Sequence, residues 1–536
     1  MTGEARRVLV VSGGPEVAET ARREWPDGHV RSCDVTSRRG LARAIETFDP
    51  DVVVAGSVAA QRALSWLRRR RGFTVPLVRY DREELVPVLA DGAPPRGTWP
   101  VRREDLLFVS TDTPEVAQQL GCVVAVGALP DGGPLTAEHV RGILSERIDQ
   151  MVTLRRRLVD HGPFRRPGWT MVDKVELTDH VDEVVVPDDA AAAETVDGFW
   201  SERMGHDRPA WRILVVRGLP DGAAVMAMKM HHALADGLSA IGTLERLLDL
   251  GEPARAGGAR RRPPAQTPGA RLVARGLWHY ATAGFAPRSR LNGRIENLQR
   301  TVATASVPTA RLRATASGLG TRTSTLVVTA VTEALSRVSA GSGEERVRLM
   351  VPVSLRSIRE ARTYGNWTAT LTADVPVAPM SPAQRLRAVD EVLTASAASG
   401  QPAGAAFALR LLGFLPPPLH RMASRLAYSS RFFNAVVSYV PGARESRVFA
   451  GAPIRAVYPV LGLAAGVRLA IGVMPWADTT GICVLADRTL AADARALAEG
   501  IRAALDDYAG PAAPGGERPP AGPAGPAGSA GPAGSK

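Results

Sequence analysis

The chain has 536 residues, of which 45% are hydrophobic and 22% are charged, as is typical of soluble globular proteins. This composition excludes a wholly disordered chain, a fibrous protein and a small fold held together by disulfides. The formal net charge is +12, and nearly all of the basic residues are arginines, which fits either a GC-rich genome or a surface that attracts anions. No zinc-finger spacing and no basic motif interleaved with aromatic residues is present, so no nucleic-acid partner is expected.

Residues 1–95 are predicted to form a compact α/β domain. Strand-like runs at 8–12, 29–35, 51–55 and 75–80 alternate with helical stretches that start at 16, 39 and 58. This alternation predicts a parallel, doubly wound, Rossmann-like sheet of unknown role. Gly13 and Gly14 follow the first strand, but Ser12-Gly13-Gly14-Pro15 is not a GxGxxG fingerprint. A tight turn is therefore favoured there over a nucleotide site.

The rest of the chain divides at stretches of unusual composition. The Pro/Gly-rich segment 91–100 predicts a domain boundary, and we expect one lobe at 101–251 and another at 301–510. Residues 252–300 between them hold ten arginines and few acids. This basic crossover would contact anionic lipid or CoA phosphates, or would be a solvated linker, which we favour. The Pro/Ala/Gly-rich segment 511–536 predicts a disordered tail.

Compartment and membrane signals are few. Cys33, Cys122 and Cys483 lie far apart in the sequence, which argues against a disulfide framework and suits a reducing cytoplasm. The N-terminus has no signal-peptide pattern, and no run of 18 apolar residues predicts a transmembrane helix. Residues 405–419 are amphipathic and would lie either on a membrane surface or buried in the protein, and we favour the buried helix.

The segment from Ala223 to Leu250 carries the chemistry. A strand-like run, Val225–Met230, leads into two adjacent histidines, and an apolar helical face begins after Gly237. Side chains alternate in extended backbone, so His231 and His232 are expected to face opposite ways, one catalytic and one structural. Asp236 suits a helix N-cap, and Gly237 permits tight packing or an unusual dihedral angle.

A neutral histidine can remove a proton from a hydroxyl or an amine that attacks a carbonyl. That is the chemistry of acyl transfer. A zinc site would need further ligands at suitable spacing, so no metal is expected.

The heptapeptide HHALADG, His231–Gly237, resembles the signature of the acyltransferase superfamily that includes chloramphenicol acetyltransferases and peptide-synthetase condensation domains. Its flanks resemble the bacterial wax ester synthase/diacylglycerol acyltransferase family. The matching segments occur in the family's order: Asp105 with Phe108, 154–158, Trp169 with Asp173, His180-Val181, 207–211, 351–356, Gly365-Asn366, 438–442, 451–454 and Tyr458-Pro459.

The resemblance implies a chloramphenicol acetyltransferase-like fold with two lobes and an active-site channel between them. Acyl-CoA would enter from one side and a hydroxyl acceptor from the other, with acyl-CoA as a co-substrate and no bound cofactor. His232 corresponds to the general base, and His231 to a packed, hydrogen-bonded neighbour. Asp236 corresponds to a structural carboxylate that pairs with an arginine, for which Arg356 is the candidate. Peripheral membrane or lipid-droplet contact is a further option for a cytoplasmic enzyme of this type.

Two departures from the family pattern concern the acceptor side. Ser324-Thr325 stands where the family has Asn-Asp, with Ser324 still able to cap a helix, and Tyr439 replaces an asparagine after Ser438. Together with Asn366, these are the candidate substrate-binding residues. The departures leave two alternatives open: an enzyme of specialised metabolism with another hydroxyl or amine acceptor, and a non-catalytic lipid-binding homologue.

Overall fold

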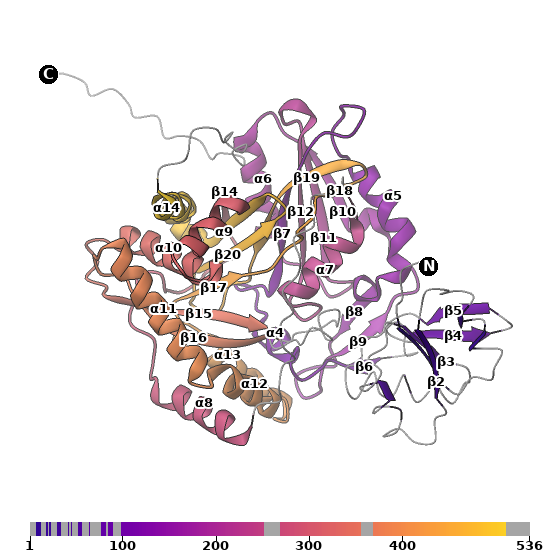
Figure 1. Ribbon diagram of the computed structural model, residues 1–536, viewed down its shortest axis with the longest axis horizontal. Coiled ribbons are helices and arrows are strands. Elements are labelled where there is room, and N and C mark those ends of the chain that lie inside the picture. The colour runs from indigo at the N-terminus through magenta and orange to yellow at the C-terminus, as the bar shows by residue number, and fades with distance from the viewer. Residues whose placement is uncertain are drawn as a thin grey trace. The chain divides into compact units, whose positions relative to one another are not determined.

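The computed structural model describes residues 98–250, 269–354 and 368–510, and parts of the N-terminal region: 7–11, 18–19, 21–22, 29–33, 41, 44–45, 52–55, 64, 77–81 and 84–88. The chain divides into two compact units, with the boundary between Trp99 and Pro100. Each unit is described separately below (Figure 1). The predicted tail and residues 251–268 of the crossover lie outside the described residues.

The N-terminal unit is built on one five-stranded sheet. Its strands are β1 (Arg7–Val11), β2 (His29–Cys33), β3 (Val52–Ala55), β4 (Leu77–Asp81) and β5 (Glu84–Val88), in the order β2-β1-β3-β4-β5. The first four strands pair with one another in parallel, which confirms the prediction of a parallel arrangement for these strands. The fifth, antiparallel to β4, was not predicted. Gly13 and Gly14 lie outside the described residues.

The second unit begins with the elements of the first lobe. They are β6 (Trp99–Pro100), α4 (Leu106–Thr111), β7 (Gln119–Val126), α5 (Ala137–Arg147), β8 (Arg156–Val159), β9 (Gly168–Met171), β10 (Val181–Val185), α6 (Asp189–Ser201), β11 (Trp211–Arg217), β12 (Ala224–His231), α7 (Gly237–Leu247) and β13 (Asp249–Leu250). A seven-stranded sheet of order β10-β11-β12-β7-β19-β18-β13 forms the centre of this lobe.

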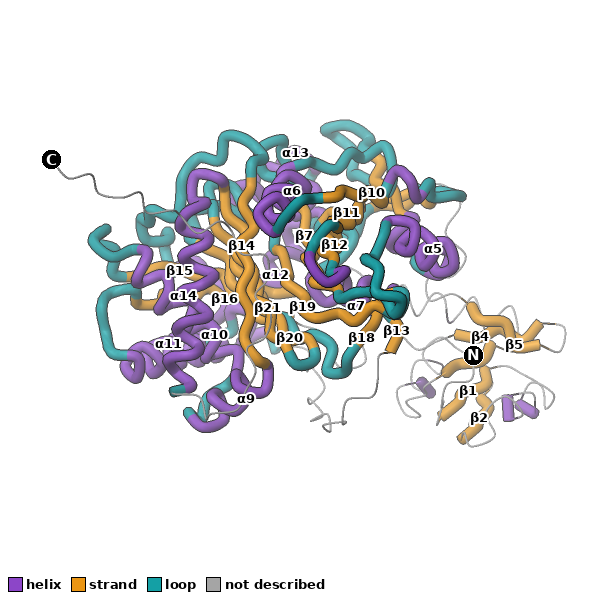
Figure 2. Tube along the Cα trace, turned by 90° about the horizontal axis from the view of Figure 1, so that it is seen from above, coloured by secondary structure: helices purple, strands orange, loops and turns teal. Residues whose placement is uncertain are grey.

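The elements of the second lobe follow α8 (Ala270–Thr282). They are β14 (Arg300–Pro308), α9 (Thr309–Gly318), α10 (Thr323–Val338), β15 (Arg346–Ser354), β16 (Thr368–Pro376), α11 (Pro382–Ala398), α12 (Gln401–Leu412), α13 (Pro417–Ala427), β17 (Ala435–Tyr439), β18 (Arg447–Phe449), β19 (Ala452–Val460), β20 (Leu469–Trp476), β21 (Thr479–Asp487) and α14 (Ala491–Ala509). A six-stranded sheet of order β14-β21-β20-β17-β15-β16 lies in this lobe, with α10, α11 and α14 along it (Figure 2).

The two lobes are not contiguous in sequence, in contrast to the prediction of separate lobes at 101–251 and 301–510. Strands β18 and β19 leave the second half and extend the sheet of the first lobe, where β19 pairs antiparallel with β7. This pairing satisfies the backbone groups of β7 on its second side, which would otherwise be an open sheet edge. The exchange ties the lobes together next to the predicted active site.

Helices α8, α12 and α13 present an apolar face to solvent. Helix α12 contacts both α8 and α13. The prediction that 405–419 forms one buried helix is wrong in two respects: the segment breaks between α12 and α13, and only one side of α12 faces the protein interior. The exposed large apolar residues of this face are Leu272, Trp278, Phe407, Leu411, Phe414, Leu419, Met422 and Leu426. Among the described residues, no helix is both long and apolar enough to cross a membrane.

Candidate active site

Strand β12, an inner strand of the seven-stranded sheet, ends at His231 and is followed directly by His232. Every residue of β12 is buried between β11 and β7. At its end the His231 N–H donates to the Ala210 carbonyl and the His232 N–H donates to the Gln118 carbonyl, each at 2.8 Å. The side chains then diverge as predicted from strand alternation: His231 is 3% exposed inside the lobe, whereas His232 lines the large cavity between the lobes.

The residues after the histidines start a helix. Asp236 is the N-cap of α7, and its side chain accepts the Ser239 N–H at 2.9 Å, so the predicted cap is confirmed. Gly237 is the first residue of α7 and lines the cavity. A Cβ placed there would lie 3.9 Å from Val440, which is ordinary contact. The prediction of tight packing or an unusual dihedral angle at Gly237 is therefore wrong.

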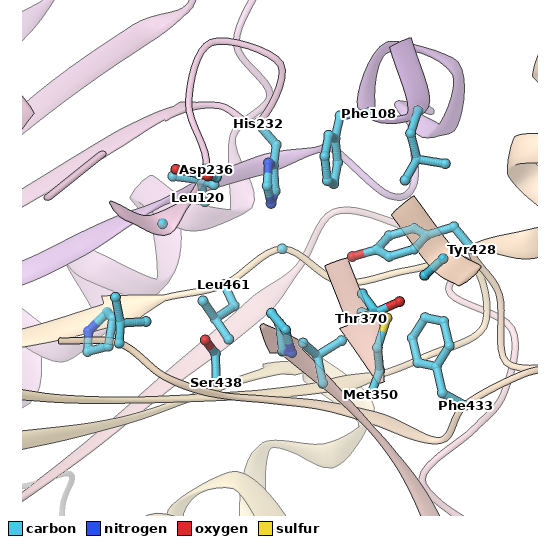
Figure 3. Close-up of a pocket in the computed structure, with 18 of the residues that line it drawn as sticks. Phe108, Leu120, His232, Asp236, Met350, Thr370, Tyr428, Phe433, Ser438 and Leu461 are labelled. Carbon is cyan, nitrogen blue, oxygen red and sulfur yellow. The ribbon is translucent and has the colours of Figure 1, made fainter. Parts of the chain in front are cut away.

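The cavity between the lobes, called the central cavity below, has a volume of about 380 Å³ and mainly apolar walls. The first lobe contributes Leu107, Phe108, Leu120, Met228, Met230, Leu238 and Ile241. The second lobe contributes Met350, Ala405, Ala408, Leu409, Leu412, Phe432, Phe433, Val436 and Leu461. Figure 3 shows His232 projecting into this space opposite Ser438, Thr370 and Met350.

The polar groups of the central cavity are few and mostly uncharged. Arg348 lines the wall, but its guanidinium is committed to Asp374, at 2.6 and 2.9 Å, and to the carbonyls of Ala283 and Gly284. Burial raises the pKa of Tyr428, which keeps its hydroxyl protonated and able to donate. The described lining therefore offers hydroxyl donors, the His232 imidazole and the Asp236 carboxylate, which also caps α7, within mainly apolar walls.

The ring of His231 closes a turn and faces a carboxylate. Its Nδ1 accepts the Ala233 N–H at 3.0 Å, and its Nε2 lies 3.8 Å from Asp112 Oδ2. The same oxygen lies 3.7 Å from His206 Nε2 and accepts a short hydrogen bond from Arg203. Burial alone would raise the pKa of Asp112, but His231, the Gln118 N–H and Arg203 lower it well below its usual range.

Asp112, His206 and His231 could together hold a metal ion, because their ligand atoms lie within 4.8 Å of one another. A metal on His231 Nε2, however, would require the ring proton on Nδ1, where the Ala233 N–H already donates. The observed hydrogen bond places the proton of a neutral ring on Nε2, which lies within ion-pair distance of Asp112 but makes no hydrogen bond to any described residue. The geometry therefore fits a carboxylate–imidazole pair better than a metal site.

The other predicted site residues fall into three groups. Ser438 and Tyr439, at the end of β17, line the central cavity. Ser324 and Thr325 lie inside α10 and are absent from the described lining residues. Ser324 is not the helix cap, because α10 already begins at Thr323 after an extended Arg322. Arg356 and Asn366 lie outside the described residues, so the predicted Asp236–Arg356 pair is not tested here.

Sequence reasoning gave no role to two aromatic residues of the central cavity. The Phe108 ring is stacked on the His232 imidazole, with centroids 3.6 Å apart and planes within 4°. The Tyr428 ring meets Phe108 edge-on at 6.1 Å. Both contacts join residues far apart in sequence, so no local pattern could have revealed them.

Three arginines in the described part of the basic crossover bind other parts of the protein. Arg275 donates to the carbonyls of Ala398 and Ser399, Arg290 pairs with Asp493, and Arg300 is buried beside Asp487. The favoured solvated linker is therefore wrong for the described part of the crossover, which forms α8 and packs on α12, and these three arginines already have protein partners.

Comparison with known proteins agrees with this site. The catalytic-domain model of the wax ester synthase/diacylglycerol acyltransferase family matches residues 102–366, and the family's C-terminal-domain model matches 364–508. A probable diacylglycerol O-acyltransferase of Mycobacterium tuberculosis is 28% identical over 422 residues, which is 71% of this chain and 90% of the relative. A second, putative one from the same species is 26% identical over 438 residues, 74% of this chain and 93% of the relative.

Solved structures share the two-lobed fold. The wax ester synthase/diacylglycerol acyltransferase of Marinobacter aquaeolei matches with a TM-score of 0.55 at 20% identity, covering 77% of this chain and all of that one. The first condensation domain of the calcium-dependent antibiotic synthetase matches with a TM-score of 0.53 at 18% identity, covering 78% and 98%. The family models and the named relatives, with this shared fold, identify the chain as an acyltransferase. More narrowly, the chain belongs to the wax ester synthase/diacylglycerol acyltransferase family.

Proposed function

We propose that this enzyme transfers a fatty acyl group from acyl-CoA to the hydroxyl of a diacylglycerol or a long-chain alcohol, with His232 as the general base. The observation that carries the proposal is the position of His232, whose imidazole projects into a mainly apolar cavity between the lobes. Acyl-CoA is a co-substrate in this reaction, and the chemistry needs no bound cofactor or metal.

The reaction follows from the imidazole and its surroundings. His232 removes the proton of the acceptor hydroxyl as its oxygen attacks the thioester carbonyl. The C–S bond then breaks, and the protonated imidazole returns the proton to the leaving thiolate, so that an ester and free CoA are formed. Direct transfer needs no acyl-enzyme, because one histidine serves both steps.

The walls of the central cavity contribute to catalysis by excluding water and by positioning the two substrates. Apolar side chains from both lobes exclude water and so suppress hydrolysis of the thioester. Holding both substrates beside one imidazole replaces a bimolecular encounter with an oriented, nearly unimolecular step.

The acceptor substrate has a second candidate. Tyr439 lines the central cavity where the family pattern has an asparagine, and burial raises its pKa. This neutral phenol narrows the cavity and favours a different acceptor geometry. A hydroxyl or an amine of specialised metabolism is therefore the second candidate, with acyl transfer itself unchanged.

The test measures CoA release with a panel of acyl-CoAs and acceptors. We expect release that requires a diacylglycerol or a long-chain alcohol, and a loss of about 10²–10⁴-fold in turnover for His232→Ala, the usual size of a general-base contribution. Retention of full rate by that variant would remove the base from the mechanism. Release that requires only an amine or another hydroxyl would support the second acceptor class. Acyl-chain binding without release would make the protein a lipid-binding homologue.

We also propose that the exposed apolar face of α8, α12 and α13 rests on an anionic lipid surface. Phe407 and Leu411, one helical turn apart on α12, are 45% and 59% exposed. Ala408 and Leu412 on the same helix line the central cavity, so one helix links the exposed face to the substrate space. Nearby arginines, among them Arg410 with 66% side-chain exposure, complement anionic headgroups.

Vesicle flotation tests this contact. We expect binding to phosphatidylcholine vesicles that contain phosphatidylglycerol, and loss of binding when Phe407 and Leu411 are both replaced by serine. Each buried side chain of this size contributes about 1.5–3 kcal/mol. The matched control replaces Leu319, 42% exposed after α9 and away from these helices, by serine. Equal flotation of all three proteins would contradict the proposal.

A further inference from the structure

One short segment of the first lobe, residues 105–118, contacts both histidines. Phe108 on α4 stacks on the His232 ring at a centroid distance of 3.6 Å. Asp112, which follows α4, places its Oδ2 3.8 Å from His231 Nε2. The Gln118 carbonyl accepts the His232 N–H at 2.8 Å, and the Gln118 N–H donates to Asp112 Oδ1 at 2.9 Å. The segment 105–118 therefore contacts the His231-His232 dipeptide through an aromatic ring, a carboxylate and its backbone.

The Phe108 contact fixes the plane of the catalytic ring. The two ring planes differ by only 4°, and Figure 3 shows the His232 edge projecting into the central cavity beside Phe108. Without a flat partner, the imidazole would rotate about the bond that joins it to Cβ, where the torsional preference is broad. A general base must hold a hydrogen bond to its substrate, and a displacement of about 1 Å costs about 10²-fold in rate.

The Asp112 carboxylate lies beside the neighbouring ring at ion-pair distance. His231 Nδ1 accepts the Ala233 N–H, so the neutral ring carries its proton on Nε2, which lies 3.8 Å from Asp112 Oδ2 and has no hydrogen-bond partner among the described residues. The Asp112 side chain is only 4% exposed, and its charge is supported by Arg203. Rotation of His231 would break the hydrogen bond to Ala233 and release the turn that follows His232.

Helix α4 is itself anchored to the second lobe. Ser110 Oγ lies 2.8 Å from His420 Nδ1 on α13, and both side chains are buried. Arg425 Nε donates to the Ser110 carbonyl at 3.0 Å. Phe108, on the same helical turn as Ser110, is therefore held at a fixed position relative to both lobes.

We propose that Phe108 and Asp112 are positioning residues for acyl transfer, Phe108 by orienting His232 directly and Asp112 by acting through His231. This inference rests on the proposed role of His232. Neither residue exchanges a proton with substrate, and Asp112 does not line the central cavity, so the loss of Asp112 lowers turnover more than substrate affinity.

Phe108 is tested by shape-matched variants. Phe108→Leu keeps an apolar side chain but loses the flat ring, and we expect kcat to fall at least about tenfold, while Phe108→Tyr and Phe108→Trp stay within about threefold. The control is Phe449→Leu, a fully buried phenylalanine outside the cavity lining, which should leave kcat unchanged. Full kcat in Phe108→Leu, or equal losses in the leucine and tyrosine variants, would overturn the role of Phe108.

A spectroscopic measurement applies even where a variant fails to fold. In the full chain with isotope-labelled histidine, NMR assigned through His232→Ala should show His232 ring protons shifted upfield by the Phe108 ring current. Phe108→Leu should abolish that shift. Ring protons at ordinary positions in the unsubstituted protein would show that the stack is not formed.

Asp112 is tested by one substitution that removes the carboxylate and by another that replaces it with an amide. We expect Asp112→Ala to lower kcat by about 10–100-fold with little change in KM for acyl-CoA, because Asp112 does not line the cavity. Asp112→Asn, which retains an acceptor oxygen, should recover part of the loss. The control is Asp197→Asn, at another buried carboxylate. Full kcat in Asp112→Ala, or an increase in KM alone, would refute the positioning role.

Two further outcomes separate this inference from its rivals. Stoichiometric zinc in the untagged protein, lost in His206→Gln, would mean that Asp112 serves a metal and not His231. If His232→Ala retains full rate, the proposed function fails. If His232→Ala is inactive while Phe108→Leu and Asp112→Ala are fully active, only the positioning inference fails.

Discussion

The contact between α8 and α12 gives a sharp prediction for one glycine. A Cβ at Gly276 would lie 2.1 Å from the Gly400 carbonyl oxygen and 3.0 Å from the Gly404 nitrogen. Both obstacles are backbone atoms, so no side chain can move aside. Since ordinary contact begins near 3.4 Å, Gly276→Ala must push the helices apart by about 1.3 Å.

The expected change in stability is the sum of two opposing effects. Replacing glycine by alanine inside a helix stabilises it by about 0.5–1 kcal/mol. Overpacking a close contact costs about 1–3 kcal/mol. The control is Gly142→Ala in α5, where a Cβ would meet nothing within 4 Å, so this variant gains the helix-forming benefit without the clash. We expect Gly276→Ala to be less stable than Gly142→Ala by about 1–3 kcal/mol.

Urea unfolding followed by circular dichroism measures both variants against the unsubstituted protein. Because Ala408 and Leu412 on α12 line the central cavity, Gly276→Ala should also relax the acyl-chain preference in the CoA-release assay. Equal stability of Gly276→Ala and Gly142→Ala would refute the close crossing of the two helices.

Three further predictions concern single side chains. Burial raises the pKa of Asp197 to about 6, so its contribution to stability is present below about pH 4 and is lost as the pH rises through about 6. In urea unfolding, Asp197→Asn should remove this pH dependence of the unfolding free energy and add about 1–3 kcal/mol at pH 7, and an unchanged pH dependence would contradict the prediction. Asp236→Ala should lower the free energy of unfolding by about 1–2 kcal/mol, because the Ser239 N–H loses its N-cap acceptor; unchanged denaturation would show that the cap is dispensable. Ala408→Phe should shift the substrate preference toward shorter acyl-CoAs. The change in kcat/KM should be about fourfold for each methylene excluded from the cavity, since each buried methylene contributes about 0.8 kcal/mol. An unchanged chain-length profile would place the acyl chain elsewhere.

Local patterns predicted the centre of the site well. The strand that ends at His231, the opposite directions of the two histidines and the Asp236 cap were all predicted, because each depends on residues within one or two turns of chain. Gly237 was misjudged because a glycine at a helix start needs no special dihedral angle.

The second-lobe wall of the central cavity could not be predicted from local sequence patterns. Met350, Thr370 and Phe433 reach the cavity from three different elements of the second lobe. The insertion of β19 beside β7 was missed because each strand is apolar and nothing in its own sequence specifies which sheet it joins.

The sequence by itself determined the class of chemistry, because the HHALADG segment sets a strand end, a turn and a helix cap within seven consecutive residues. Only the tertiary structure decided how that chemistry is controlled. The stack of Phe108 on His232 and the pairing of Asp112 with His231 depend on how α4 packs across the lobes. Such contacts join residues more than a hundred positions apart, and packing of the whole core, with no local periodicity, brings them together.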